Sequence, residues 1–466
     1  MPTARQTDYP QLWMGAILST GAKKGPGAGA ALLPSIDDMT DNTPAGDNAP
    51  RSYLETPTVR PGGVAGKVEL RAGSNDAVLA VVPHMLGFYP SRSLVVLGLG
   101  DRNRVRVTFR YDLPDPPDGE LAADIADHAA YVLTRERMSA ALLIGYGPEF
   151  LVNAVIGCVA DTLNVAGVRL ADVLRADGGK FWSLFCDDPA HCPPEGTPYD
   201  PGSHPAAAEM SAAGLTAHPD REALVRTLQP PAGRSQDIQH AVTLAGLRLG
   251  KIAAQSQACG EPEPQLRLAR IGRTAVQRAI RLYRAGGSIT NPHEIAWLAV
   301  LLANLPVRDD AWARMDPSHS DDHLRLWTDV VKGASVDYVP APAALLAFTA
   351  WQAGNGALAA VAVDRALAAD PQYSMAQLLS GVLQAGLPPS AARMPMRPAE
   401  VAASYTPARS GTSAGRSGRS RSTGTRRQGA RRRSSRASRR RRSDGPDGHA
   451  VTANAAATTA GGASRR

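Results

Sequence analysis

The sequence contains little cysteine and no long hydrophobic run. Four cysteines in 466 residues provide no disulfide framework, which indicates a reducing compartment. The longest apolar stretch, residues 77–99, is interrupted by Pro83 and Pro90, so no segment reaches the ~18 apolar residues of a membrane-spanning helix. The apolar run at residues 12–18 has no basic region before it, unlike a secretory signal. We therefore expect a cytoplasmic protein.

Familiar catalytic signatures are also missing. The chain has no serine nucleophile elbow, no phosphate-binding loop with its lysine, and no zinc-protease histidine pair with an intervening glutamate. No enzyme class therefore follows from a motif, and no cofactor is identified.

Charge of both signs is unevenly distributed. Residues 401–466 contain 16 arginines, no lysine and two aspartates, a net charge of +14, whereas residues 1–400 carry a net charge of −6. A mildly acidic body is not typical of a nucleic-acid-binding domain.

The arginine-rich tail is short of large apolar residues, so we expect it to be disordered. Its arginines, from Arg416 to Arg442, predict non-specific contact with nucleic acid that weakens with salt. A solvated appendage without a partner is an equal alternative, because blocks of like charge often serve only solubility.

Composition and hydrophobic periodicity divide the chain into four parts. We expect a disordered extension over residues 1–66, an α/β domain over 67–213, a helical domain over 214–390 and a disordered basic tail over 391–466.

The α/β domain is expected to contain a mixed sheet with covering helices. Residues 94–99 form a continuous apolar run, and residues 105–111 alternate strictly, so a hairpin should join two antiparallel strands. Further strands are predicted at residues 68–70, 140–146, 168–175 and 180–185, and helices at 74–82, 120–138 and 149–166.

From about residue 219, strand patterns give way to amphipathic helices. Residues 342–371 resemble the second half of a tetratricopeptide repeat, because small residues and a terminating proline occur at suitable spacings. An ordinary helical hairpin is the simpler interpretation, since a repeat surface needs about three units.

Four segments carry a family resemblance: PHMLGFYPSRSLVV at residues 83–96, LIGYGP at 143–148, the proline-rich loop at 181–200 and VRDDAWARM at 307–315. In this order they resemble an actinobacterial family catalogued as domain of unknown function 4192, over residues 68–389. The resemblance implies no activity, cofactor or catalytic residue.

The proline-rich loop contains Cys186, His191 and Cys192, which are residue types that bind metals. Five residues separate the cysteines, against two to four in most structural zinc sites, and the adjacent His191 and Cys192 are hard to direct at one ion. We therefore predict two free thiols packed in the loop and no metal site.

Gly145, Tyr146 and Gly147 end a predicted strand just before a helix, where open α/β sheets bind ligands. A tight strand-to-helix turn is the simpler interpretation, because the full glycine fingerprint is missing. The segment at residues 88–93 lies at the same sheet edge if its strand is antiparallel, and at the opposite edge if it is parallel.

Asp309, Asp310, His319 and His323 form the remaining candidate site. Asp316 and Pro317 are expected to begin a helix that runs to about Val331 and places both histidines on its core-facing side. These residues could bind a metal or act as acid and base. Hydrogen-bonded core histidines beneath a solvated acidic face are the simpler interpretation.

We therefore expect an α/β domain followed by an all-helical one, working as a non-enzymatic module that binds a partner protein or a small ligand. The alternative is a metal-dependent hydrolase with a site between the two domains, built from Asp309, Asp310, His319 and His323.

Overall fold

The computed structural model describes residues 60–61, 68–69, 74–186, 188–259, 264–391 and 397–405. A six-stranded sheet has the order β4-β3-β5-β6-β7-β8. Its strands are β3 (Ser93–Leu99), β4 (Val105–Asp112), β5 (Ala140–Tyr146), β6 (Arg169–Asp177), β7 (Lys180–Ser183) and β8 (Thr197–Pro198). Only β5 and β6 run parallel, and the other neighbours are antiparallel. The predicted mixed sheet is confirmed.

The connections follow the hydrophobic patterns. β3 and β4 form the expected hairpin around a short 3-10 turn, Asp101–Asn103. The parallel pair is joined by helix α4 (Glu149–Val165), as a crossover requires. Gly178 and Gly179 both have positive φ, and they allow the tight turn that joins β6 to β7.

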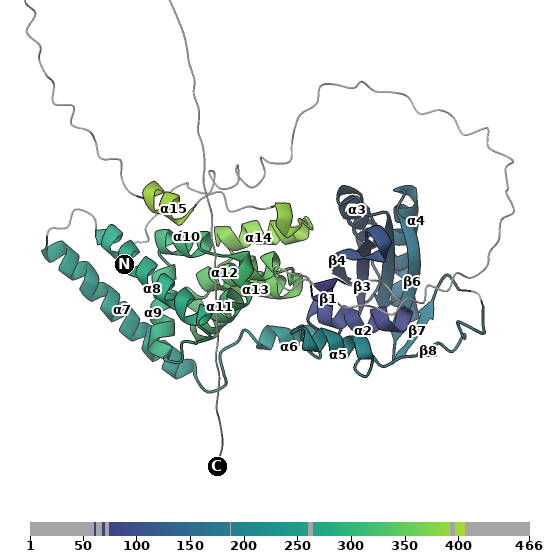
Figure 1. The fold of residues 1–466 in the computed structure, drawn as a ribbon, viewed down its shortest axis with the longest axis horizontal. Coiled ribbons are helices and arrows are strands. Elements are labelled where there is room, and N and C mark those ends of the chain that lie inside the picture. The colour runs from purple at the N-terminus through teal and green to yellow at the C-terminus, as the bar shows by residue number, and fades with distance from the viewer. Residues whose placement is uncertain are drawn as a thin grey trace, which may run out of the picture. The chain divides into compact units, whose positions relative to one another are not determined.

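Helices cover both faces of this sheet. Helix α3 (Gly119–Arg135) and α4 bury their apolar faces on one side, whereas α2 (Asn75–Leu86) packs on the other (Figure 1). Alternate residues of β5 divide between the two cores: Leu142 and Ile144 face α2, and Ala141 and Leu143 face α3 and α4. β5 is therefore buried on both faces, which explains its continuous apolar run.

The remainder of the described chain is helical. After α5 (Pro205–Ala212) and α6 (Arg221–Arg226), further helices follow one another (Figure 1). They are α7 (Ser235–Ala258), α8 (Pro264–Arg284), α9 (Pro292–Leu302), α10 (Leu305–Ala313), α11 (Ser320–Gly333), α12 (Pro340–Gln352), α13 (Gly356–Ala369), α14 (Ser374–Gln384) and α15 (Pro398–Ser404). Among the described residues, no helix combines the length and apolar character needed to cross a bilayer.

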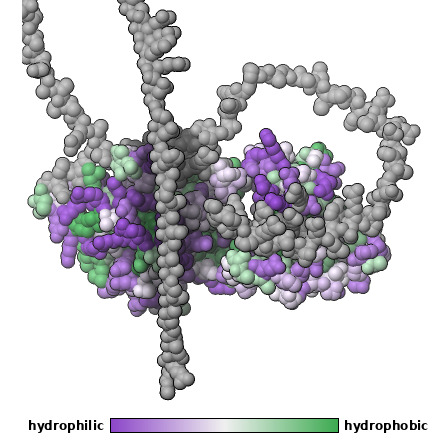
Figure 2. Space-filling view, viewed as in Figure 1, coloured by the Kyte–Doolittle hydropathy of each residue, from purple (hydrophilic) through white to green (hydrophobic). Residues whose placement is uncertain are grey.

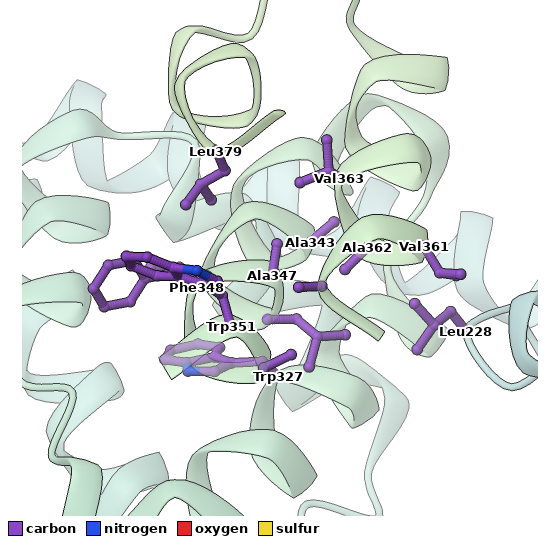
Figure 3. Packing of buried hydrophobic residues seen from close by; sticks show 14 of the residues in the cluster. Leu228, Trp327, Ala343, Ala347, Phe348, Trp351, Val361, Ala362, Val363 and Leu379 are labelled. Atoms are coloured by element: carbon purple, nitrogen blue, oxygen red, sulfur yellow. The ribbon is translucent and has the colours of Figure 1, made fainter. Parts of the chain in front are cut away.

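The predicted helical hairpin is formed by α12 and α13. Gly354 adopts a φ of 81° in the turn between them, a conformation that favours glycine. Figure 3 shows Ala343 and Ala347 of α12 directed toward Ala362 of α13, with Trp327 of α11 beneath them. Small side chains at this contact let the two helices approach closely.

Three boundaries differ from the sequence expectation. Arg60–Pro61 (β1) lies inside the segment expected to be disordered up to residue 66, and it pairs with Val68–Glu69 (β2), at the strand expected over residues 68–70. α15 lies inside the tail that was expected to be disordered. The helix is stabilised by the hydrogen bond that Glu400 accepts from the Arg397 amide and by burial of Val401. The rest of residues 1–66 and of the tail, including Arg416 to Arg442, lies outside the described residues.

The third difference concerns the helix expected from Pro317. Pro317–His319 forms a separate 3-10 turn, and α11 begins only at Ser320. Asp316 caps the short turn by accepting from the Ser318 amide, so the capping signal is real but opens a different kind of helix.

We predict that Gly145→Ala destabilises the protein by about 1–3 kcal/mol, because a methyl group overpacks the contact between β5 and α4. A Cβ atom at Gly145 would lie 2.2 Å from Cγ1 of Val152, which is buried. Urea unfolding measures the loss.

The control is Gly157→Ala, on helix α4, which also carries Val152; an added Cβ at Gly157 meets nothing within 4 Å. It is expected to leave stability unchanged or raise it by up to ~1 kcal/mol. Equal effects of the two substitutions would contradict the packing argument.

Candidate functional site

Helix α10 carries two aspartates that the protein buries almost completely. Asp309 and Asp310 are each 1% exposed. Oδ1 of Asp309 accepts from Nε and Nη2 of Arg308, at 2.8 and 2.6 Å, and its Oδ2 accepts from the Tyr405 hydroxyl. The hydrogen bond from Tyr405 to Asp309 connects the end of α15 to α10.

Asp310 has a guanidinium partner of its own. Its Oδ2 accepts from Nε of Arg314 at 2.6 Å, and its Oδ1 accepts from Nη2 at 3.0 Å. Such fork-to-fork pairing is the strong geometry for arginine and carboxylate. All four carboxylate oxygens of Asp309 and Asp310 are therefore engaged, and a metal or substrate would have to displace an existing donor.

The two candidate histidines lie in different environments. His323 is 1% exposed on α11, on the stripe that also buries Leu326 and Trp327. His319 ends the 3-10 turn with its side chain 42% exposed, and its Nδ1 lies 3.1 Å from Oδ2 of Asp316. The expectation that both histidines are on the core-facing side is correct for His323 and wrong for His319, because the helix starts one residue after His319.

His323 is a buried polar group without a hydrogen-bond partner on either ring nitrogen among the described residues. Burial, followed by the positive charge of Arg284, lowers the pKa of His323 to about 4. The ring is therefore neutral at pH 7. Leaving its N–H unpaired costs about 1–3 kcal/mol, which sets this position apart from ordinary core packing.

A pocket of about 490 Å³ lies next to these residues. It is lined by the C-terminal half of α8, by the end of α10 with Asp316 and Pro317, and by Pro398 of α15. Its apolar wall consists of Ile280, Ala313, Met315, Pro317 and Pro398, and its uncharged polar group is Gln277.

Charge in this pocket is predominantly positive. The lining contains three arginines, Arg281, Arg284 and Arg314, and one carboxylate, that of Asp316. Nη2 of Arg284 lies 3.2 Å from Oδ2 of Asp316, while Arg314 is held by Asp310. The Arg281 side chain is exposed, and its guanidinium has no ion-pair or hydrogen-bond partner within the described ranges. One guanidinium therefore remains uncompensated at the pocket.

The four segments that carried the family resemblance occur in this fold in order, and a family model matches residues 76–390. The chain belongs to the family described as Domain of unknown function (DUF4192). No curated protein and no solved structure matches it. The DUF4192 match covers the sheet from β3 to β8 and the pocket lining from Gln277 to Pro317, whereas Pro398 lies beyond it.

Two DUF4192 segments meet at one edge of the sheet. β3 is antiparallel to β5, with Ser93 opposite Tyr146, so residues 88–93 lie at the same edge as Gly145–Gly147. This settles the alternative that the sequence left open. The Gly147 amide donates to the Ala176 carbonyl at 2.9 Å, and a Cβ on Gly147 would lie 3.7 Å from Cα of Arg92.

The two glycines at this edge have different reasons. Gly145 leaves room for Val152 of α4, whereas Gly147 has a φ of 136°, a conformation that favours glycine. Tyr146 points into the core that α2 covers, its hydroxyl has no partner in the described part, and burial raises its pKa well above the usual range. A ligand-binding role for Gly145, Tyr146 and Gly147 stays a prediction.

The proline-rich loop keeps its cysteines as thiols. None of the four cysteines forms a disulfide. Burial and the neighbouring Cys186 raise the pKa of the Cys192 thiol to about 12, so it is protonated at pH 7. His191 pairs with Asp188 at 2.9 Å. The described residues contain no group of three histidine, cysteine or acidic side chains arranged for a metal.

Sequence reasoning missed the arginines of α8. The sequence does contain a signal for them, because two sets of three arginines spaced three residues apart, 267–273 and 278–284, follow each other with no acidic residue among them. The net charge of −6 over residues 1–400 hides this local excess.

We predict that Asp309→Asn lowers the free energy of unfolding by about 3–5 kcal/mol, because it leaves the buried guanidinium of Arg308 without its counter-charge. Asp321→Asn, at an exposed site on α11, is the control and should change stability by less than ~0.5 kcal/mol. Chemical denaturation compares the two. A loss below ~1 kcal/mol for Asp309→Asn would contradict the assignment.

His323 should make stability depend on pH. Its folded pKa of about 4 lies below the unfolded value of about 6.5, so the unfolded chain binds the proton first as pH falls. Stability from this group is complete above pH ~6.5 and falls by roughly 3 kcal/mol by pH ~4.

His323→Leu removes both the titration and the unpaired N–H. We expect it to be neutral or stabilising at pH 7 and to flatten the unfolding free energy between pH 6.5 and 4. Thermal unfolding of both proteins across that range is the measurement, and an unchanged pH profile in the variant would disprove the role of His323.

Proposed function

We propose that this DUF4192 protein is a non-enzymatic binding module that holds an anionic ligand in the pocket between α8 and α10. The observation that carries the proposal is Arg281, an exposed guanidinium without a protein counter-charge at a pocket of about 490 Å³. Guanidinium groups bind phosphate and carboxylate in a bidentate fashion, which suits them to such a ligand.

The surroundings of Arg281 support an anion rather than a cation. Arg284 and Arg314 stand at the same pocket and are oriented by Asp316 and Asp310. A guanidinium held in one geometry loses less entropy when it binds a ligand. The apolar wall around Ile280 and Met315 would accommodate an uncharged portion of the ligand.

The contacts weigh against the alternative, a metal-dependent hydrolase built on Asp309, Asp310, His319 and His323. The aspartate oxygens all accept bonds from arginine or tyrosine, and His323 is buried away from solvent. Catalysis there would require these pairs to open, and breaking a buried pair costs about 3–5 kcal/mol.

We also propose that residues 67–213 and 214–390 form separate domains and that the protein acts in the cytoplasm. The change from strands to helices after β8 supports the division, and the unpaired cysteines suit a reducing compartment. Limited proteolysis of the full chain tests the division, since exposed linkers are cut first.

We predict that Arg281→Glu weakens the binding of inorganic pyrophosphate at least tenfold, because it replaces the uncompensated positive charge with a negative one. Isothermal titration of the full chain at about 0.1 M salt measures this; at that salt, charges more than ~10 Å away are largely screened.

Arg270→Glu is the matched control, since it makes the same charge change on α8 outside the pocket lining. It should leave pyrophosphate affinity within about twofold. Absence of pyrophosphate binding by the unmodified protein, or equal losses in both variants, would overturn the proposed function.

A further inference from the structure

Helix α8 has one strongly basic side. It contains six arginines and no acidic residue over 21 positions. The arginines are Arg267, Arg270, Arg273, Arg278, Arg281 and Arg284. No lysine interrupts this set, so all of these cations have the planar, multi-donor head group.

The arginines and the buried residues occupy opposite sides of α8. At 3.6 residues per turn, the six arginines fall within an arc of about 140°. The buried residues fall on the opposite side, within about 100°; they are Ala269, Gly272, Val276, Ala279, Ile280 and Tyr283. The basic side is therefore directed away from the helical core by the packing of the helix itself.

Three of these arginines are exposed, and their guanidinium groups have no partner among the residues that the structure describes: Arg270, Arg278 and Arg281. They span 11 positions, or about 16 Å along the helix axis. Figure 2 shows many hydrophilic residues, with several hydrophobic ones between them, over the part of the helical region where α7 and α8 lie in Figure 1. Arg281 belongs both to this row and to the pocket, so the pocket forms one end of a longer basic surface.

The length of the row decides the kind of anion. A single phosphate or carboxylate fits the pocket but cannot contact Arg270 and Arg281 together. A DNA duplex presents one negative charge per ~1.7 Å of axis, so a length of about 16 Å carries roughly nine charges. A polyanion with closely spaced charges therefore complements this face.

Charge on the remainder of the body limits where a polyanion binds. Residues 1–400 carry −6 in total, and α8 contributes +6, so the other positions of that range carry −12. The arginine-rich segment from Arg416 to Arg442 is a second basic element in the same chain. Two lysine-free arginine clusters suit the same phosphate-bearing partner.

We propose that the arginine face of α8 is a docking surface for the sugar–phosphate backbone of a nucleic acid. This inference rests on the proposed anion pocket and names its ligand class. Because the contacts are made to phosphates, binding is independent of base sequence and falls steeply with salt.

The test is the affinity of the full chain for a random-sequence 20-base-pair duplex, a probe length of about two helical turns. The double substitution Arg270→Glu with Arg278→Glu should lower this affinity at least tenfold at about 0.1 M salt. It should also reduce the slope of log affinity against log salt by about 2, since each lost phosphate contact contributes about 0.9.

The matched control substitutes Arg106→Glu with Arg169→Glu, two exposed arginines on the sheet that make the same charge change. Thermal unfolding of each variant establishes that it is folded. Equal losses in the two double variants would show a general charge effect and overturn the proposal, as would an unchanged duplex affinity in the α8 variant.

Pyrophosphate binding distinguishes the nucleic-acid proposal from the anion-pocket proposal. If the α8 double variant keeps its duplex affinity while Arg281→Glu abolishes pyrophosphate binding, the nucleic-acid proposal is rejected and the anion pocket is retained. If neither affinity falls, both proposals are rejected. Tight binding of poly-glutamate that depends on Arg270 and Arg278, with no binding of the duplex, would replace the nucleic acid by an acidic protein.

Discussion

The arrangement of the helical region depends on two arginine–aspartate pairs at α10 in which both carboxylates are buried. Arg308 and Asp309 draw in Tyr405 from the end of α15, and Asp310 holds Arg314 at the edge of the pocket. Neither aspartate would tolerate burial alone, because an unpaired carboxylate in the interior is strongly destabilised. The same two ion pairs therefore stabilise the fold and hold Arg314 in the pocket wall.

Much of the fold could be predicted from periodicity. β5 was expected at 140–146 and lies there, because an uninterrupted apolar run suits a strand covered on both faces. The start of α11 and the existence of α15 could not be predicted. α15 depends on a contact distant in sequence, the bond from Tyr405 to Asp309. The start of α11 depends on the geometry of the Asp316 cap, which opens a 3-10 turn and not an α-helix, and the capping residue alone does not distinguish the two.

The candidate site was predictable only in part. The spacing of Asp310 and Arg314 is the i, i+4 spacing of a helical ion pair and could have been read as one. Arg308 and Asp309 are neighbours, which normally do not face each other on a helix, so their pairing needed the tertiary structure. The basic face of α8 was visible as an arginine repeat, but whole-body net charge concealed it. Local charge on one helix face is the more informative quantity.

Binding of an anion by Arg281 and its neighbours, as we propose, can be tested by arginine footprinting of the full chain with phenylglyoxal, read by mass spectrometry with and without pyrophosphate. We expect pyrophosphate to protect Arg281 and Arg284, both at the pocket, while Arg106 and Arg169 on the sheet react at unchanged rates. Unchanged reactivity of Arg281, with protection at arginines elsewhere in the chain, would show that the anion binds at another site.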